Sequence, residues 1–285
     1  MNVLATDTAT PPQVDATALV DRALLEQRVR EMYRLVATDP GAPRHFETGY
    51  SLALRLGYPE RLLRSIPAEA VASFAGVGYH LDLAHPFIGD AVLDLGSGSG
   101  MDAFCAAIGV GASGRVVGVD FTDAQIQKAT FLRARDGFDN VTFVEAGIDE
   151  LPFEDGSFDV VISNGAINLS PAKHLVFAEA ARVLRRGGRI AIADMVSATA
   201  LEESTRRTTE LWAASVAGAI PREAYADALE DAGFRITTIR RNEYRFTSER
   251  VRQACRTNGI RSTTFAAVRS ARARAADGRR LGPLR

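Results

Sequence analysis

Short apolar runs dominate the middle of the chain, after residue 90. Five such runs cover residues 91–95, 115–120, 141–145, 158–163 and 189–194. Near-continuous apolar runs of this length are typical of strands that are buried on both faces of a parallel sheet. Helix-like patterns lie between them, at residues 101–108, 124–135 and 171–184. Strands that alternate with helices at this spacing predict an α/β fold with a Rossmann-like, doubly wound sheet.

Helical patterns also flank this region on both sides. Before it they cover residues 18–37, 61–66 and 68–74, and after it residues 201–215, 222–232 and 248–257. Two late strands, 234–240 and 263–269, bring the predicted sheet to seven mostly parallel strands. We therefore expect five parts: a flexible leader (1–17), an N-terminal helical cap (18–90), a Rossmann-like core (91–199), an extension that completes the sheet (200–270) and a basic, flexible tail (271–285).

The composition fits a globular protein. The 285 residues include 34 Lys and Arg against 35 Asp and Glu, and 46% are hydrophobic, which is too apolar for a disordered chain. A formal net charge of −1 argues against a nucleic-acid partner. We expect neither a signal peptide nor a membrane span, and hence a cytoplasmic protein without a membrane partner. Two cysteines provide no metal knuckle, and we expect no metal site. The oligomeric state stays open.

The most informative segment is VLDLGSGSG, residues 92–100, in which a predicted strand runs into closely spaced glycines. Gly96, Gly98 and Gly100 allow a sharp turn and let a ligand approach the backbone where a Cβ atom would collide. The helix that follows offers unpaired N–H groups to the ligand. Asp120 ends the next strand, twenty residues further on, where Rossmann-type sites bind the hydroxyls of an adenosine ribose. Together these features predict a cofactor that contains adenosine.

Small differences within this segment select the cofactor. The dinucleotide motif is G-x-G-x-x-G, but here the third glycine comes one position early and Met101 stands in its place. Asp94 puts a carboxylate beside the loop, which suits a cationic ligand better than a pyrophosphate. S-adenosylmethionine has no phosphate and carries a sulfonium and an ammonium group. The sequence favours this cofactor over a nicotinamide dinucleotide, which stays an alternative.

Four blocks of the chain resemble the class I S-adenosylmethionine-dependent methyltransferases: VLDLGSGSGMD, GRVVGVDFTDAQIQKA, NVTFVEAGIDELPFEDGSFDVVISN and FAEAARVLRRGGRIAIAD. The resemblance implies a methyltransferase with the following cofactor-binding residues. The loop of Gly96, Ser97, Gly98 and Gly100, beside Asp94, would hold the methionine part of the cofactor, and Asp120 would hold the ribose. Phe121, Gly147 and Ile148 would flank the adenine, and Asn164 would lie beneath the cofactor.

Segments outside this core are similar to the arsenite methyltransferase branch, and the similarity extends over about residues 56–265. That family binds arsenic through three cysteines. At the matching places this chain has Gly165, Ser215 and the cysteine-free segment Gly76–Tyr79. Because trivalent arsenic is a soft centre that prefers thiolates, we expect a small-molecule methyl acceptor that need not be arsenic. A true arsenite methyltransferase that uses external thiols stays an alternative.

The same resemblance locates the acceptor. Tyr79, Gly165, Trp212 and Ser215 stand where the family shapes its acceptor pocket, and we predict that they line it here. An acceptor that must lose a proton would need a base, for which His80 is the candidate. Two alternatives from other classes are an NAD(P)-dependent oxidoreductase and a binding protein that senses the cofactor without catalysis.

Overall fold

The computed structural model describes residues 15–213 and 215–270. The sequence predictions for residues 1–14 and 271–285 lie outside these ranges. Of the predicted leader, the last three residues are described: Ala16 is buried, and its N–H donates to the carbonyl of Pro171 (2.8 Å). Within the described ranges, no helix is both long enough and apolar enough to cross a bilayer.

The described strands form one seven-stranded sheet in the order β3-β2-β1-β4-β5-β7-β6. They are β1 (Ala91–Leu95), β2 (Arg115–Asp120), β3 (Val141–Glu145), β4 (Phe158–Asn164), β5 (Leu184–Val196), β6 (Phe234–Arg241) and β7 (Arg261–Arg269). β7 is antiparallel to both of its neighbours, and the first five strands are parallel. The predicted fold class, a doubly wound, mostly parallel sheet, is confirmed.

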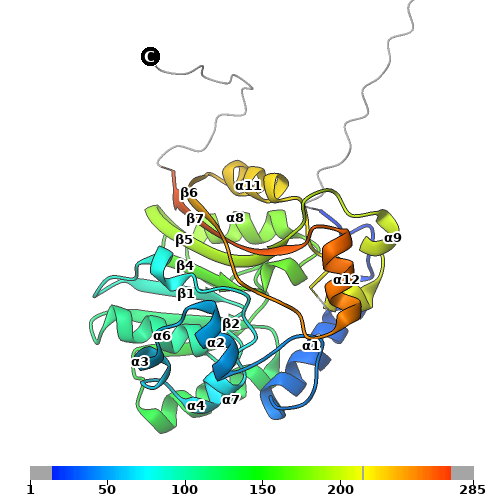
Figure 1. The fold of residues 1–285 in the computed structure, drawn as a ribbon. Helices are drawn as coiled ribbons and strands as arrows, with labels where there is room; N and C mark the ends of the chain where they lie inside the picture. The colour runs from blue at the N-terminus through cyan, green and yellow to red at the C-terminus, as the bar shows by residue number, and fades with distance from the viewer. Residues whose placement is uncertain (1–14, 214, 271–285) are drawn as a thin grey trace, which may run out of the picture.

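Helices cover both faces of this sheet (Figure 1). They are α1 (Arg22–Thr38), α2 (Tyr50–Leu56), α3 (Glu60–Leu63), α4 (Ala68–Ala72), α5 (Leu81–Ala84), α6 (Met101–Val110), α7 (Asp123–Asp136), α8 (Lys173–Val183), α9 (Glu203–Arg206), α10 (Thr209–Ala213), α11 (Arg222–Asp231) and α12 (Glu249–Thr257). A short 3-10 turn, Ile167–Leu169, precedes α8. Helices α2 to α7 pack on one face, and α8 and α11 pack on the other.

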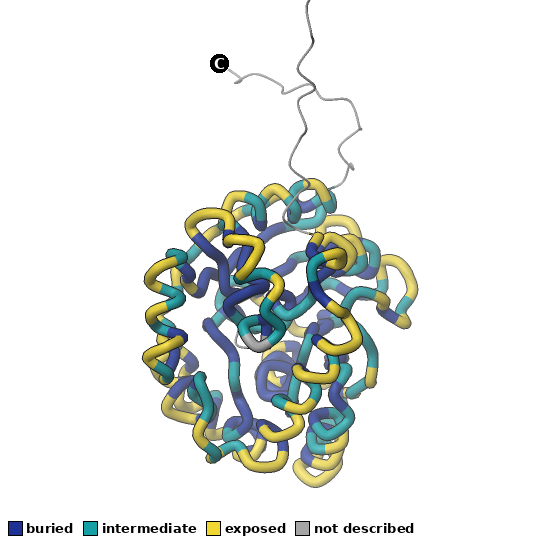
Figure 2. Tube along the Cα trace, turned by 90° about the vertical axis from the view of Figure 1, so that its right-hand side faces the viewer, coloured by how far each residue is buried: buried dark blue, intermediate teal, exposed yellow. Residues whose placement is uncertain are grey.

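The side chains of the central strands point alternately to the two faces of the sheet, which explains why helices cover both faces. Val92 of β1 faces the core under α6, whereas its neighbour Leu93 faces the core under α8 and α11. Successive side chains of a strand point to opposite faces, so strands with apolar residues at every position are buried from both sides. Figure 2 shows these buried segments enclosed by helices whose outer turns are exposed. The carboxyl ends of β1, β2 and β4 meet at one edge of the sheet.

The structure differs from the sequence predictions where local signals are weak. The helix predicted over residues 201–215 is two short helices, α9 and α10. Thr208 separates them, because its carbonyl accepts the N–H groups of Leu211 and Trp212 and so begins a new turn. β5 begins five residues earlier than predicted, since the polar, glycine-containing stretch 184–189 has no strand pattern. The short helices α2 and α5 were not predicted.

Candidate functional site

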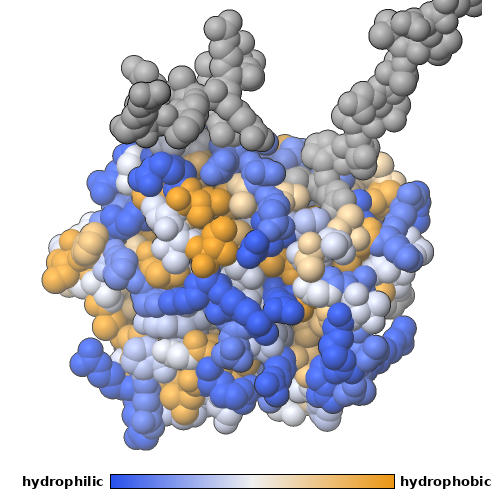
Figure 3. All heavy atoms as spheres, turned by 45° about the horizontal axis from the view of Figure 1, so that its top comes forward, coloured by the Kyte–Doolittle hydropathy of each residue, from blue (hydrophilic) through white to orange (hydrophobic). Residues whose placement is uncertain are grey.

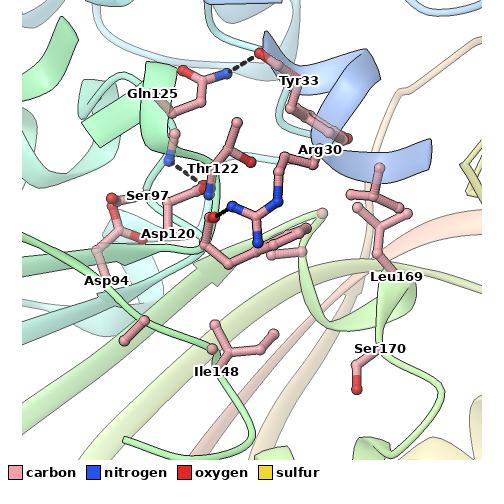
Figure 4. A pocket seen from close by; sticks show the side chains of 18 of the residues that line it. Arg30, Tyr33, Asp94, Ser97, Asp120, Thr122, Gln125, Ile148, Leu169 and Ser170 are labelled. Carbon is pink, nitrogen blue, oxygen red and sulfur yellow. Dashed lines mark hydrogen bonds between the residues drawn. The ribbon is translucent and has the colours of Figure 1, made fainter. Parts of the chain in front are cut away.

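A cavity of about 630 Å³ opens at the edge where β1, β2 and β4 end. Its walls come from α1, the segment Ser73–Gly76, the glycine loop, residues 145–152 and residues 164–171. In Figure 4, Asp94, Ser97 and Asp120 lie on one side of it, Leu169 and Ser170 on the other, and Arg30 reaches between them from α1. The volume is in the range of pockets that bind small organic ligands.

The glycine loop has the backbone that its sequence predicts. Gly96 and Gly100 have φ angles of 71° and 91°, in the left-handed region. A Cβ atom at Gly96 would lie 2.2 Å from the Cβ of Ala166, and one at Gly100 would lie 2.6 Å from the ring of Phe143. Both positions therefore require glycine, for the backbone angle and for space. The loop is thereby held close to residues 164–166 of the opposite wall.

Asp120 anchors the loop from the neighbouring strand. One carboxylate oxygen accepts the N–H of Gly98 (3.0 Å), and the other accepts the N–H of Thr122 (2.8 Å). Burial raises the pKa of this carboxyl group, while the two backbone donors act in the opposite direction. Asp120 lines the cavity, and each of its oxygens has a second lone pair, so Asp120 can accept further hydrogen bonds from a ligand.

Asp94 is the most unusual group in the cavity. Its side chain is 2% exposed, and its Oδ2 atom has no hydrogen-bond partner among the described residues. Burial, followed by the charges of Asp102 and Asp120, raises its pKa well above the ordinary value; the N–H of Ala103 opposes this. A buried carboxylate oxygen without a partner costs free energy. A cationic or N–H-bearing ligand group would supply the missing partner.

Asn164 joins the two walls below the glycine loop. Its amide donates to Asp102 (3.0 Å), and its oxygen accepts the N–H of Val77 (2.7 Å). Asp102 also accepts the hydroxyl of Tyr58 (2.5 Å). This network fixes the segment Gly76–Gly78 against the end of β4. His80 lies behind it, fully buried, with Nδ1 3.5 Å from the Asn164 amide, and burial lowers its pKa.

Helix α1 covers the cavity, and its contribution could not be seen in the sequence. Arg30 donates to the carbonyl of Phe121, and its guanidinium lies 4.8 Å from the centre of that ring. Arg22 pairs with Asp149 (2.8 Å) on the opposite rim. Gln125 of α7 donates to the carbonyl of Tyr33 (2.9 Å). From the sequence alone, the arginine-rich face of α1 looks like an ordinary solvent-exposed helix face. The residues that contact it in the fold lie about ninety positions further along the chain.

The structure brings most of the predicted cofactor residues together and leaves most of the predicted acceptor residues elsewhere. The cavity lining includes Asp94, Gly96, Ser97, Gly98, Asp120, Phe121, Gly147, Ile148, Asn164 and Gly165. The lining does not include Gly100, Tyr79, His80, Trp212 or Ser215. Tyr79 packs on Tyr58 (4.6 Å between ring centres), and Trp212 is buried with its indole N–H donating to the carbonyl of Arg206. The roles assigned to these residues stay predictions.

A buried lysine holds the far wall of the cavity. Lys173 donates to the carbonyls of Asn168 (3.0 Å) and Ser170 (2.8 Å), and its ammonium lies 5.0 Å from the centre of the Trp212 ring. Burial lowers its pKa to about 7, while nearby Asp194 acts in the opposite direction.

We expect this lysine to give the protein a measurable pH dependence. Its pKa is lower in the folded than in the unfolded chain, so the unfolded state binds more protons above about pH 7, and stability should rise with pH until about pH 10. Lys173→Met should reduce this rise and leave two carbonyls unpaired, at about 1–3 kcal/mol each. Urea unfolding of both proteins at several pH values measures this. An equal slope in the variant would assign the pH dependence to other groups.

The fold and the cavity define a class of protein: the class I S-adenosylmethionine-dependent methyltransferases. A family model described as a methyltransferase domain matches residues 88–253. The chain therefore belongs to the methyltransferase family, and S-adenosylmethionine is the cofactor of its class. The nicotinamide alternative is not favoured.

The relatives refine this assignment. An arsenite methyltransferase of Halobacterium salinarum is 36% identical over 247 residues, which cover 81% of this chain and 63% of the relative. Another, of Aquipseudomonas alcaligenes, is 40% identical over 56% of this chain and 47% of the relative. The crystal structure of an arsenic(III) S-adenosylmethionine methyltransferase from Chlamydomonas reinhardtii aligns with a TM-score of 0.59 and 30% identity, over 80% of this chain and 74% of that one. The chain thus spans between about half and two thirds of the curated relatives it matches.

Proposed function

We propose that this protein transfers the methyl group of S-adenosylmethionine to a small organic acceptor. The observation that carries the proposal is the buried Asp94 oxygen without a partner, beside a loop that only glycine can form. An ammonium group that donates to Asp94 would provide that partner and remove the cost of burying the charge. The bound cofactor supplies an electrophilic methyl group on a sulfonium.

In this proposal, residues of the chain bind the cofactor and orient it. Asp120 is suited to accept the two ribose hydroxyls, because both of its oxygens already lie at fixed positions set by Gly98 and Thr122. Phe121 and Ile148 offer apolar surface for the adenine. Asn164 fixes the wall beside the glycine loop, and α1 excludes water from above. Alignment and water exclusion are the contributions that a protein makes to a methyl transfer.

The acceptor is proposed to be organic because the cavity lacks thiols. The two cysteines of the chain are Cys105, which is buried in α6, and Cys255, which is half-buried in α12, and neither is on the lining. Burial raises the pKa of both thiols, that of Cys255 to about 11, so both disfavour the thiolate that binds arsenic. Gly165, on the lining, leaves room for a bulkier acceptor, and the acceptor roles of Tyr79, Trp212 and Ser215 stay predictions.

A second candidate has specific support. The three relatives described above are arsenite or arsenic(III) methyltransferases. An arsenic centre already bound to external thiols, such as those of glutathione, would not require cysteines of the protein. The two candidates differ in the acceptor and share the cofactor site.

Thermal stabilisation tests the shared part. S-adenosylmethionine or its demethylated product, at about a hundredfold its dissociation constant, should stabilise the fold by about 2.7 kcal/mol, which is a shift of a few degrees. NAD⁺ should give no shift at the same concentration. Equal stabilisation by NAD⁺, or none by either methyl cofactor, would contradict the proposal.

Labelled cofactor then separates the acceptors. With arsenite and glutathione, we expect no methylated arsenic, whereas a cell extract should yield a labelled organic product. Mass spectrometry detects both. Methylated arsenic as the product would establish the second candidate in place of the first.

A further inference from the structure

A second concave site lies further along the same edge of the sheet, between the end of β6, α12 and the start of β7. It has a volume of about 450 Å³. Five arginines line it, Arg241, Arg245, Arg252, Arg256 and Arg261, and we call it the arginine pocket. Glu243 is the acidic residue on its lining. This site shares no lining residue with the large cavity.

Three of these arginines are not neutralised within the described structure. Arg252 and Arg256 share the carboxylate of Glu249, at 2.6 Å each. Arg241, Arg245 and Arg261 are exposed, and within residues 15–213 and 215–270 none of them makes a side-chain hydrogen bond or ion pair. Like charges gathered around one concavity repel each other. An anion bound among them would remove this repulsion.

The backbone holds these arginines in place. The N–H of Asn242 donates to the carbonyl of Ser262 (3.0 Å), and its amide donates to the hydroxyl of the same serine (2.9 Å). Arg241 and Arg261 therefore flank a fixed pairing of β6 with β7. Arg240, the neighbour of Arg241, points to the other side and pairs with Asp82. Strand alternation thus assigns Arg241 to the pocket side.

The floor of the arginine pocket is apolar. Met195, Phe246 and Ile260 are buried beneath it. The rings of Tyr244 and Phe246 meet edge to face, with 5.1 Å between their centres. An arginine rim over an aromatic floor matches a ligand that has an anionic group on an apolar body. On the face that Figure 3 shows, apolar residues appear as separate patches among hydrophilic ones.

The surrounding sequence shows the same bias. Residues 234–270 contain nine arginines and no lysine against two glutamates, in a chain whose net charge is −1. Such asymmetry is typical of a segment that binds an anion. Arginine, with its planar fork of donors, is the side chain best suited to a phosphate. The concave shape and apolar floor favour a small ligand over an extended nucleic-acid backbone, which would be followed by a long, open stripe of charge.

We propose that the arginine pocket binds a phosphorylated small molecule with an aromatic or apolar body, at a site separate from the methyl-transfer cavity. Arg241 and Arg261 would hold the phosphoryl group, and Tyr244 with Phe246 would pack against the body. This site goes beyond the proposed methyl transfer and does not depend on it.

Calorimetric titration with phenyl phosphate and with inorganic phosphate tests the site. Phenyl phosphate should bind more tightly than phosphate, because only the former reaches the aromatic floor. The double variant Arg241→Gln/Arg261→Gln should weaken phenyl phosphate binding by at least about tenfold, since a lost charged hydrogen bond corresponds to a change of that size or more. Arg235→Gln, on the same strand but away from the pocket, should leave the affinity within about twofold of the wild type, well below that change.

Three results would overturn the proposal. The first is no heat of binding with phenyl phosphate at about 10 mM, a concentration that detects even millimolar affinity. The second is an equal loss of affinity in Arg235→Gln, or a loss in Arg30→Gln, which would place the anion on the general surface or in the large cavity. The third is tight, salt-sensitive binding of a single-stranded oligonucleotide when phenyl phosphate fails, which would assign the surface to nucleic acid.

Discussion

Replacement of Asp120 by alanine is expected to abolish stabilisation by S-adenosylmethionine. Two charged hydrogen bonds to ribose hydroxyls, at about 1.5–3 kcal/mol each, correspond to a loss of roughly 10²- to 10⁴-fold in affinity. The variant also releases the N–H of Gly98 from its partner at 3.0 Å, so the glycine loop loses one of its two bonds to β2, and the bond from the N–H of Ser97 to the carbonyl of Val119 (2.8 Å) is left. We expect no shift of the melting temperature at cofactor concentrations that saturate the wild type.

Asp139→Ala provides the matched control. Asp139 is an exposed aspartate in the turn between α7 and β3, outside the cavity lining. Its replacement should leave the cofactor-induced shift intact. Far-ultraviolet circular dichroism shows whether Asp120→Ala is folded when the shift is measured. A folded Asp120→Ala protein with a shift of the wild-type size would remove the ribose assignment.

The core of the fold could be predicted because its signals are local. β1, β2 and β3 have the predicted boundaries, since an apolar run that is buried on both faces differs from everything around it. The glycine loop and Asp120 could be predicted together, because the loop directly follows one strand pattern and Asp120 ends the next. Both signals, and the distance between them, can be read from the sequence. These features also placed most of the proposed cofactor residues on one cavity.

The rest depends on contacts between distant segments. Nothing in the helical pattern of residues 18–37 indicates that Arg30 reaches the carbonyl of Phe121. Trp212 was assigned to the acceptor pocket by resemblance, but in this structure it is 1% exposed and packs beside Lys173. Such packing is set by tertiary structure, which a motif does not record. The unpartnered oxygen of Asp94 could not be predicted either, because it depends on the absence of a neighbour.

Asp94→Asn is expected to change stability and binding in opposite directions. Without ligand, the variant should be more stable than the wild type at pH values where Asp94 is ionised, by about 1–3 kcal/mol, because it removes a buried, unsatisfied charge. It should also lose most of its affinity for S-adenosylmethionine, because an amide does not balance an ammonium. Thermal unfolding with and without the cofactor measures both effects, and Asp139→Asn is the exposed control. A variant that is less stable and still binds the cofactor would contradict this role of Asp94.

The pH dependence should follow from the raised pKa of Asp94, which burial and the two neighbouring aspartates cause. In the ligand-free protein the folded state holds this proton more tightly than the unfolded chain, so stability falls as pH rises from the unfolded value of about 4 through the raised pKa. A cationic ligand favours the ionised carboxylate and expels the proton. The affinity for S-adenosylmethionine should therefore rise with pH over that interval and become constant above it, whereas Asp94→Asn should bind weakly at every pH. Melting experiments with and without cofactor give both curves, stability against pH and affinity against pH. We expect the two to slope in opposite directions, because the ionised Asp94 carboxylate lowers the stability of the free protein and is the form that binds the cofactor.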